Sequence, residues 1–178
     1  MSKAVILGTG SYLPRKVLTN SELEQMVETS DEWIASRTGI RARRIAGKDE
    51  QNYQLAAKAG HRALAVTGIE PEELDLIIVA TISPHMIMPS TACFVQAELG
   101  AVNAFAYDIN AACAGFTYGL DLASKYIQSN PKMKILLIGA EALSTRVNWQ
   151  DRNTCVLFGD GAGAVVLGGS TDGRGVFG

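Results

Sequence analysis

Short apolar runs alternate along the chain with longer stretches in which apolar residues recur every three or four positions. The first pattern is typical of strands buried on both faces, and the second of helices that bury one face. The runs predict strands at 4–7, 76–81, 105–109, 135–138 and 164–167, and the periodic stretches predict helices at 50–67, 90–99 and 113–129. This order of elements favours an α/β fold with a layered, mostly parallel sheet.

Capping signals predict two shorter helices near the N-terminus. Thr19 stands three residues before Glu22, a spacing at which the hydroxyl and the carboxylate each satisfy a free backbone amide. Ser30 precedes two acidic residues, whose charges favour the positive end of a helix that carries Trp33. We therefore expect short helices to follow Thr19 and Ser30.

Composition excludes several classes of protein. Of the 178 residues, 47% are hydrophobic and 19% are charged, so the chain can bury enough apolar surface to fold as one domain. The 16 basic and 18 acidic residues give a net charge of −2, without the basic surplus of a nucleic-acid-binding protein. The longest apolar run, 76–80, is far shorter than the roughly 20 residues that span a membrane.

Cysteine and histidine usage argues against a disulfide framework or a metal site. The cysteines, Cys93, Cys113 and Cys155, show no C-x-x-C spacing, and the histidines, His61 and His85, are scattered. The N-terminus has only a short apolar stretch, unlike a secretory signal. We expect a reducing, cytoplasmic compartment.

Cys113 is the strongest candidate for chemistry. It follows the strand at 105–109 across the small residues Ala111 and Ala112 and stands at or near the start of a long helix. The partial positive charge and free amides of a helix N-terminus lower a thiol pKa and can stabilise an oxyanion on an attached acyl group. The alternative is a buried structural cysteine, and the residues alone leave it open.

The other cysteines and the histidines are weaker candidates. Cys93, in the middle of a predicted helix, and Cys155, in an apolar stretch, are expected to pack in the core. A cysteine nucleophile normally needs a base within hydrogen-bond reach. Neither His61, on a helix face expected to be solvated, nor His85, in a loop, is adjacent to Cys113 in sequence.

Glycine-rich and basic segments are the remaining motifs. The glycines at 8–10, which we expect to close the first strand, and those at 159–163 lack the strand-loop-helix order of a phosphate loop, so turns and close packing are favoured. The segment 37–44 holds four of the 16 basic residues just after Trp33. An aromatic face beside guanidinium groups suits a nucleotide, and an ordinary solvated run of charges is an equal alternative.

Five segments together resemble one family, the β-ketoacyl-acyl-carrier-protein synthase III enzymes, which have a thiolase fold and start bacterial fatty acid synthesis. The matching segments are GTGSYLP at 8–14, TSDEWI at 29–34, RTGI at 37–40, AACAGF at 111–116 and FGDGAGA at 158–164. They run in order over nearly the whole chain. The resemblance implies a thiolase-like half with a five-stranded mixed sheet, helices on both faces, and a last strand near 162–168 antiparallel to the others.

The resemblance also implies roles for single residues. Cys113 matches the nucleophile that accepts an acyl group, usually acetyl, from coenzyme A. No cofactor is implied, because the acyl-CoA is a substrate. The positions that hold the nucleotide end of coenzyme A are Trp33, Arg37, Thr38 and Arg152, and those of the acyl pocket are Met88, Leu143 and Phe158. Met88 stands where the family often has an aromatic residue that the partner subunit contributes, so the resemblance leaves the primer chain length open.

The family's enzymes are nearly twice as long as this chain, and their catalytic His and Asn lie in the second half. We therefore interpret residues 1–178 as the N-terminal thiolase-fold domain of an acyltransferase, a truncated protein or fragment without the C-terminal catalytic half. The intact enzyme would condense the acyl group with malonyl-acyl carrier protein, and this chain alone is expected not to do so. The strand at 105–109 would pair with its copy in a homodimer.

Two other functions stay open. One is a related ketosynthase that primes polyketide synthesis, and the other is a non-catalytic half-domain that dimerises. A cysteine hydrolase ranks last, because no histidine is paired with Cys113.

Overall fold

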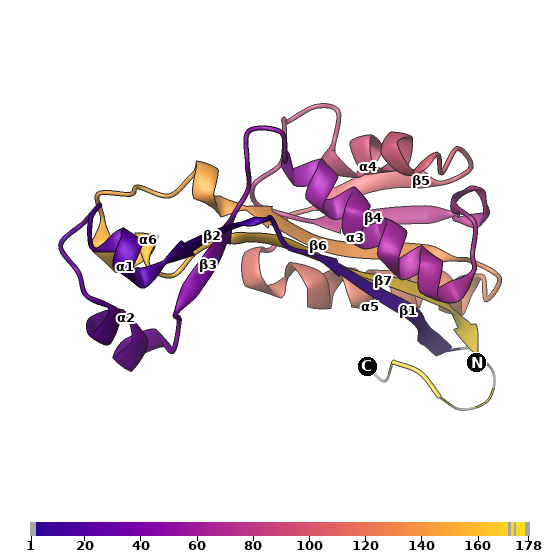
Figure 1. The fold of residues 1–178 in the computed structure, drawn as a ribbon. Coiled ribbons are helices and arrows are strands. Elements are labelled where there is room, and N and C mark those ends of the chain that lie inside the picture. The colour runs from indigo at the N-terminus through magenta and orange to yellow at the C-terminus, as the bar shows by residue number, and fades with distance from the viewer. Residues whose placement is uncertain (1–2, 171, 173, 177–178) are drawn as a thin grey trace.

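Five strands form one mixed sheet, in the order β1-β7-β6-β4-β5 (Figure 1). The computed structural model describes residues 3–170, 172 and 174–176. The strands of this sheet are β1 (Lys3–Tyr12), β4 (Leu76–Ala80), β5 (Phe105–Ile109), β6 (Ile135–Ala142) and β7 (Asp160–Ser170). β4 is parallel to β5 and to β6, whereas β7 is antiparallel to both of its neighbours, β6 and β1. Four strands therefore share one direction and β7 opposes them, which confirms the expected mixed sheet.

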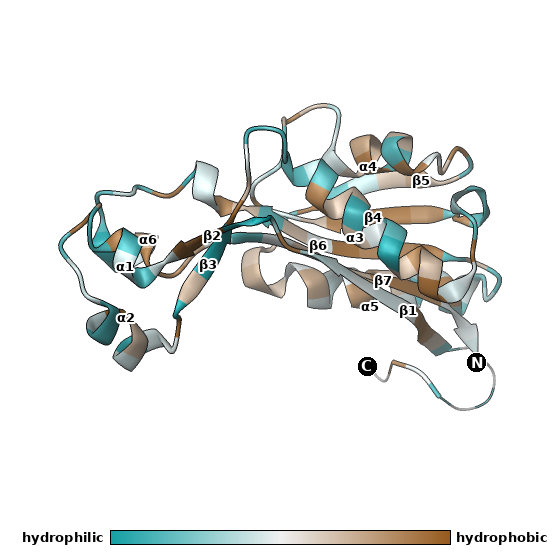
Figure 2. Cartoon of the chain, viewed as in Figure 1, coloured by the Kyte–Doolittle hydropathy of each residue, from teal (hydrophilic) through white to brown (hydrophobic). Residues whose placement is uncertain are grey.

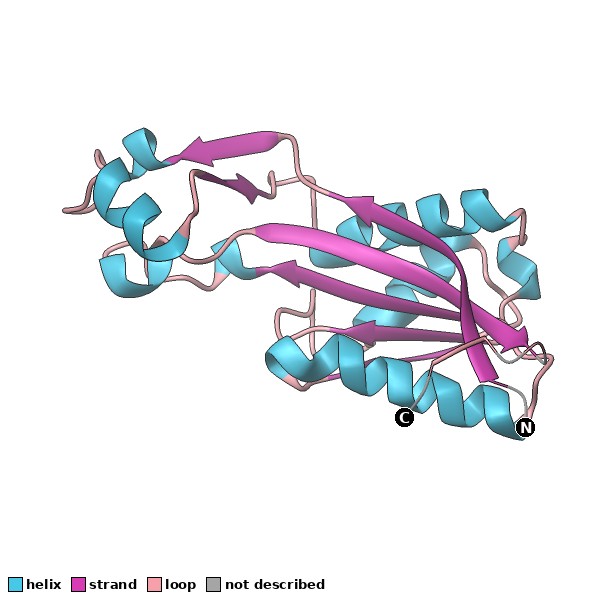
Figure 3. Ribbon diagram, turned by 90° about the horizontal axis from the view of Figure 1, so that it is seen from below, coloured by secondary structure: helices cyan, strands magenta, loops and turns pink. Residues whose placement is uncertain are grey.

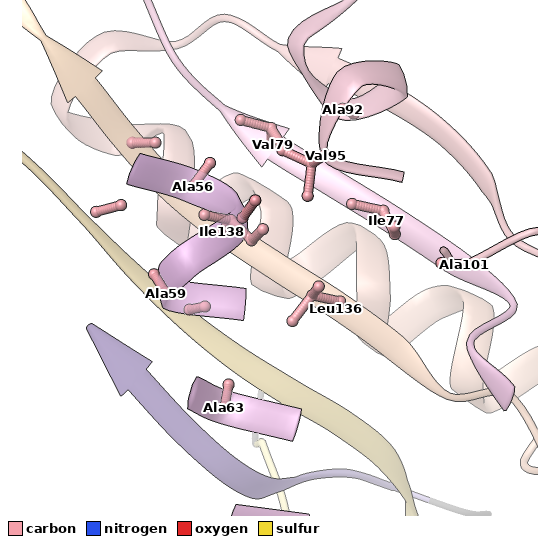
Figure 4. Packing of buried hydrophobic residues seen from close by; sticks show 14 of the residues in the cluster. Ala56, Ala59, Ala63, Ile77, Val79, Ala92, Val95, Ala101, Leu136 and Ile138 are labelled. Carbon is pink, nitrogen blue, oxygen red and sulfur yellow. The ribbon is translucent and has the colours of Figure 1, made fainter. Parts of the chain in front are cut away.

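Helices cover both faces of the sheet, as expected. α3 (Asn52–Thr67) and α4 (Thr91–Leu99) pack on one face and α5 (Gly115–Ser129) on the other (Figure 1). Alternate residues of β4 point to opposite faces, so Ile77 and Val79 join the cluster under α3 and α4 (Figure 4). Leu76 and Ile78 join the cluster under α5. This alternation explains why β4 reads as an unbroken apolar run.

Hydropathy follows the same arrangement. Figure 2 shows apolar residues along β4 and a mixture of polar and apolar residues along α3, whose outer face is open to solvent. Among the described residues, no helix is both long enough and apolar enough to cross a bilayer.

A second, two-stranded sheet lies beside the main one, and the sequence did not predict it. β2 (Lys16–Thr19) and β3 (Ala42–Ile45) pair antiparallel (Figure 3). The short helices α1 (Asn20–Leu23), α2 (Asp31–Thr38) and α6 (Arg152–Cys155) surround a small core of Leu18, Leu23, Ile34, Cys155 and Val156. We call these five elements the small lobe. Its strands have only four residues each, and half of β3 is charged, so they give no strand pattern.

The glycines at 8–10 do not close the first strand, contrary to the prediction. β1 continues through them to Tyr12 and stays paired with β7 along this stretch, where it also lies against α3. A Cβ on Gly10 would come within 2.3 Å of the Ala59 carbonyl oxygen and 2.4 Å of the Ala63 amide nitrogen. Close packing, the other expected role of these glycines, is therefore their function. Gly161 and Gly163 likewise lie within β7 rather than in a turn.

The ends of several elements follow the predicted signals. Thr19 and Ser30 cap α1 and α2 through their hydroxyls, and Gly68 ends α3 in the left-handed conformation. The helix predicted from Cys113 begins instead at Gly115. Short 3₁₀ helices are η1 (Pro71–Glu73), η2 (Ala112–Ala114) and η3 (Leu143–Thr145).

Candidate active site

One edge of the main sheet brings several of the candidate residues together. β4, β5 and β6 all end at this edge, and the antiparallel β7 begins there, with Ala142 paired to Asp160. Cys113 follows β5, and Leu143 follows β6 directly. Phe158 stands two residues before β7. The carboxyl ends of parallel strands are where α/β proteins build their sites, and the topology places Cys113, Leu143 and Phe158 at this edge of the sheet.

Cys113 lies in η2, which directly precedes α5, and its side chain is exposed. The preceding Ala112 has φ +47°, a left-handed conformation that costs a residue other than glycine roughly 1–3 kcal/mol. The Ala114 amide donates to the Ala111 carbonyl over 3.0 Å and closes the turn. Cys113 is thus held by backbone geometry at the tip of a tight turn.

The start of α5 can stabilise negative charge. No side chain caps α5, and no acidic residue lies in its first turn. The Gly115 amide donates to the Ala112 carbonyl, and the amides that follow it in the first turn, together with the positive dipole end, lie near Cys113.

Two glycines bring α5 close to the sheet and so set the height of Cys113 above the strand ends. A Cβ on Gly115 would lie 3.0 Å from the Ala80 Cβ, and one on Gly119 would lie 2.4 Å from Cδ1 of Leu137. A larger residue at either position would require the helix or the neighbouring side chain of the sheet to shift.

Buried and half-buried carboxylates hold the loops around this edge, and the sequence gave no warning of them. Glu141 of β6 accepts from the Ile82 amide over 2.9 Å and from the Ser83 hydroxyl, which fixes the loop after β4. Asp108 of β5 accepts from the first two amides of α4, at 2.8 and 2.7 Å. Asp160 accepts from the amides of Ala46 and Ser144 and ties η3 to the small lobe. The sequence signal for these carboxylates was a polar residue near the end of a strand. The sequence does not indicate which groups donate hydrogen bonds to them.

The small lobe gathers three of the four residues expected at the nucleotide end of coenzyme A. The guanidinium carbon of Arg37 lies 4.6 Å from the centroid of the Trp33 ring, and that of Arg152 lies 4.8 Å from it. Arg152 also donates to the Glu28 carbonyl over 3.2 Å. The Trp33 ring is half-buried against the core of the small lobe, and two cations beside it form a surface that suits a base and its phosphates.

Thr38, the fourth residue, lies at the end of α2 and has a structural role there. Its hydroxyl donates to the Ile34 carbonyl over 2.7 Å and accepts from the Ile40 amide over 3.0 Å. These bonds satisfy the last turn of α2 and its exit, so they hold Arg37 and Trp33 in place.

The basic run is not one cluster. Only Arg37 reaches Trp33, while Arg41 pairs with Asp31 and Arg44 donates to the Pro14 carbonyl. Arg43 is buried, and burial lowers the pKa of its guanidinium, which donates to backbone carbonyls and to a neighbouring amide side chain. Neither interpretation of the run, nucleotide site or solvated face, holds for all four arginines.

The other candidate residues differ in how far their side chains are exposed. Leu143 is half-buried and Phe158 is 38% exposed, whereas Met88 is 84% exposed in the loop between β4 and α4. His61 is exposed on α3, as expected, and the His85 ring packs on Tyr53 with centroids 5.1 Å apart.

Among the described residues, no side chain is hydrogen-bonded to the Cys113 sulfur. Across the described residues, no group of three or more His, Cys, Asp and Glu side chains is placed to hold a metal ion.

The remaining cysteines differ from each other. Cys155 is fully buried in the small lobe, as expected, and burial together with nearby Asp151 raises the pKa of its thiol. Cys93 was expected to be in the middle of a helix and in the core. It lies instead in the first turn of α4, half-buried, where its sulfur accepts from the Ser90 hydroxyl over 3.2 Å.

Comparison with known proteins gives a consistent result. The family model described as 3-oxoacyl-[acyl-carrier-protein (ACP)] synthase III matches residues 107–178. The β-ketoacyl-[acyl-carrier-protein] synthase III of Desulfotalea psychrophila is 58% identical over 97% of this chain and 53% of its own length. The crystal structure of the synthase III of Aquifex aeolicus superposes with a TM-score of 0.92 at 56% identity, over 97% of this chain and 55% of that one.

The chain is a homologue of β-ketoacyl-acyl-carrier-protein synthase III. It spans about half the length of the curated synthase III relatives that it matches. A priming β-ketosynthase from the R1128 polyketide pathway is also similar, with a TM-score of 0.91 at 39% identity over 94% of this chain and 50% of that one. Synthase III enzymes and this polyketide enzyme therefore share the fold found here.

Proposed function

We propose that this chain is the N-terminal thiolase-fold domain of a synthase III that starts fatty acid synthesis, and that it carries the nucleophile, Cys113, and the nucleotide end of the acyl-CoA site. One observation supports this most strongly. An exposed thiol stands beside the uncapped start of α5, at the sheet edge that also carries Leu143 and Phe158. The high identity to synthase III relatives over nearly the whole chain supports the same assignment.

The first reaction is transfer of an acyl group to sulfur. Cys113 gives its proton to water, and the resulting thiolate attacks the thioester carbonyl of acyl-CoA. The oxyanion that forms accepts hydrogen bonds from free amides near the start of α5. The intermediate collapses as the bond from carbon to the CoA sulfur breaks, and CoA leaves as a thiolate that takes a proton from solvent. The product is an acyl thioester on Cys113.

The small lobe holds the far end of the substrate. Trp33 offers a face for the adenine, and the guanidiniums of Arg37 and Arg152 offer positive charge for the phosphates. Thr38 positions this group through the end of α2. Leu143 and Phe158 contact the acyl chain, and Met88 contributes to the acyl pocket of a partner subunit.

The second reaction needs more than the described residues. Malonyl-acyl carrier protein must lose carbon dioxide to form a carbanion that attacks the acyl-cysteine, and a His and an Asn of the intact enzyme stabilise that step. No described side chain is bonded to Cys113. We expect this chain alone to acylate slowly and not to condense.

Intact-mass measurement tests the first reaction. The chain is incubated with excess acetyl-CoA, and Cys113→Ala serves as the control. One acetyl group should appear on the wild-type chain and none on the variant. No added acetyl mass after prolonged incubation would contradict the proposed acylation of this chain.

Two alternatives rest on particular observations. The likeness to a priming β-ketosynthase and the exposed Met88 favour polyketide priming. Acylation by longer or branched acyl-CoA in preference to acetyl-CoA would support polyketide priming.

The second alternative is a non-catalytic half-domain that dimerises along β5, an edge strand with Phe105 half exposed. A dimer by sedimentation with no acylation would favour that one, and a monomer at high concentration would oppose the proposed homodimer.

A further inference from the structure

The proposed nucleotide site is assembled from two segments that are far apart in the chain. Trp33 and Arg37 belong to α2, whereas Arg152 is the first residue of α6 (Figure 1). Arg152 donates to the Glu28 carbonyl, but this bond is exposed to solvent and is therefore a weak constraint on the position of α6. How Arg152 lies against the Trp33 ring must depend on contacts deeper in the small lobe.

Arg43, in β3, is buried inside the small lobe and only 6% exposed. Its Nη1 atom donates to the Leu18 carbonyl over 3.2 Å. Its Nη2 atom donates to Oδ1 of Asn20 over 2.8 Å and to the Val156 carbonyl over 3.2 Å. Leu18 belongs to β2, Asn20 begins α1, and Val156 is the C-cap of α6. One guanidinium thus holds three other elements of the lobe.

Asn20 extends this network to α2. The side chain is 1% exposed, and its Nδ2 atom donates to Oδ1 of Asp31 over 2.7 Å and to the Ile40 carbonyl over 2.8 Å. Asp31 is the first residue of α2, and Ile40 follows the C-cap of that helix. Arg43 and Asn20 therefore connect all five elements of the small lobe, including the two that carry the nucleotide site.

The chemistry of Arg43 favours a role in arrangement rather than in stability. Burial of a guanidinium is costly, and among the described residues Arg43 forms no ion pair that would offset this cost. Well-packed apolar residues often stabilise a core as well as a buried charge does, but apolar packing has no direction. A planar guanidinium fixes several acceptors at defined angles.

We propose that Arg43 is a positioning residue, which holds Arg152 against the Trp33 ring through its bonds to Val156 and Asn20. Arg43 is buried, so it acts through Arg152 rather than on a ligand. The expected effect on coenzyme A rests on the proposed nucleotide site, whereas the placement of Arg152 can be measured without any ligand.

A double-mutant cycle tests the effect on binding of coenzyme A. In the wild-type background, Arg152→Ala should raise the dissociation constant about fivefold. Arg43→Met removes the donors and should itself raise it about fivefold, and adding Arg152→Ala should then raise it less than about twofold further. A residue that only stabilises the fold would lower the unfolding temperature and leave the effect of Arg152→Ala intact. A full effect of Arg152→Ala in the Arg43→Met background would therefore overturn the proposal.

Arg44→Met is the matched control. Arg44 is the next residue of β3, is exposed, and donates to the Pro14 carbonyl outside the network. In this background Arg152→Ala should keep its full effect. Circular dichroism checks that each variant is folded at the temperature of the titration. If Arg43→Met does not fold, Arg43→Lys replaces it, because one ammonium cannot span the three acceptors. A full effect of Arg152→Ala in Arg43→Lys would overturn the proposal equally.

Fluorine NMR of the chain labelled with 5-fluorotryptophan locates Arg152 without a ligand. The chain has two tryptophans, Trp33 and Trp149, and Trp33→Phe assigns their signals. Arg152→Ala should shift the Trp33 signal in the wild-type and Arg44→Met backgrounds but not in Arg43→Met. A shift of equal size in Arg43→Met would overturn the positioning role. The expected fluorine pattern without binding of coenzyme A to the wild type would overturn the nucleotide site alone and would support the positioning of Arg152 by Arg43.

Discussion

The guanidinium of Arg152 lies against the indole ring of Trp33, 4.8 Å from centre to centre, although 118 residues separate the two in the chain. Arg37 approaches the same ring from within its own helix. An adenine that stacks on Trp33 must share the ring with these cations or displace one of them toward the phosphates. In the proposed nucleotide site, base stacking and phosphate pairing would therefore occur together.

Loss of Trp33 or Arg152 should weaken binding of coenzyme A. Trp33→Ala removes a stacking face, at a cost of about 1–3 kcal/mol, and Arg152→Ala removes one cation, at about 1 kcal/mol. These costs correspond to dissociation constants raised about 5- to 150-fold and about 5-fold. Calorimetric titration with coenzyme A measures both.

Arg41→Ala is the control for that experiment. Arg41 is an exposed arginine of the same lobe, paired with Asp31 over 2.9 Å and without contact to the ring. It should bind coenzyme A as the wild type does. Unchanged binding by Trp33→Ala would contradict the proposed nucleotide site.

Gly10→Ala should destabilise the fold strongly. Its methyl group would meet backbone atoms of α3 at 2.3 and 2.4 Å, and backbone cannot move aside as a flexible side chain can. We expect a loss of about 2–4 kcal/mol in the free energy of unfolding, measured by urea titration. Gly163→Ala is the matched control, because a Cβ at Gly163 in β7 meets nothing within 4 Å, and it should change stability little.

These glycines also show where sequence patterns stop being informative. The bounds of β5 and the caps at Thr19 and Ser30 follow from local residues, so the sequence predicted them. Gly8 and Gly10 look like a turn, because the pattern contains no sign of the helix that packs on them. Close approach is a property of two elements distant in sequence.

In the candidate site, too, some features were predictable from the sequence and others were not. The placement of Cys113 after a strand and before a helix was visible in the residues, although η2 and the left-handed Ala112 were not. Hydrophobic periodicity separates buried from exposed faces, but it does not assign partners to polar residues. Glu141 and Asn52 were missed for that reason, since their bonds join β6 and α3 to one loop.

Glu50 should make stability depend on pH. The Tyr12 hydroxyl bond, then the Gly47 amide and nearby positive charges, lower its pKa from the ordinary 4.5. A lowered pKa in the folded state means that the carboxylate adds stability above the ordinary pKa, and that this stability is lost as pH falls through the folded value. Glu50→Gln should therefore be less stable than wild type by about 1 kcal/mol at pH 7.

The difference between Glu50→Gln and wild type should disappear in acid, at pH values below the lowered pKa. Thermal unfolding at a series of pH values measures it. Asp49→Asn removes the neighbouring, exposed carboxylate and should show no comparable trend. A Glu50→Gln deficit that is the same at every pH would mean that shape, rather than charge, explains the loss.

The cysteines should react with iodoacetamide in an order set by their surroundings. Cys113 is exposed at a helix start, whereas Cys155 is fully buried with a thiol pKa raised by that burial. Reactivity follows thiolate content and access, so Cys113 should be alkylated first and Cys155 only after unfolding in guanidinium. Peptide mass mapping over time separates the sites, and Cys113→Ala should lose the fast phase.

Prior incubation with acetyl-CoA should slow the fast phase of alkylation, because an acylated sulfur cannot attack iodoacetamide. Fast labelling of Cys155 in the native protein would contradict the packing of the small lobe, and fast labelling of Cys113 that acetyl-CoA does not slow would count against its acylation.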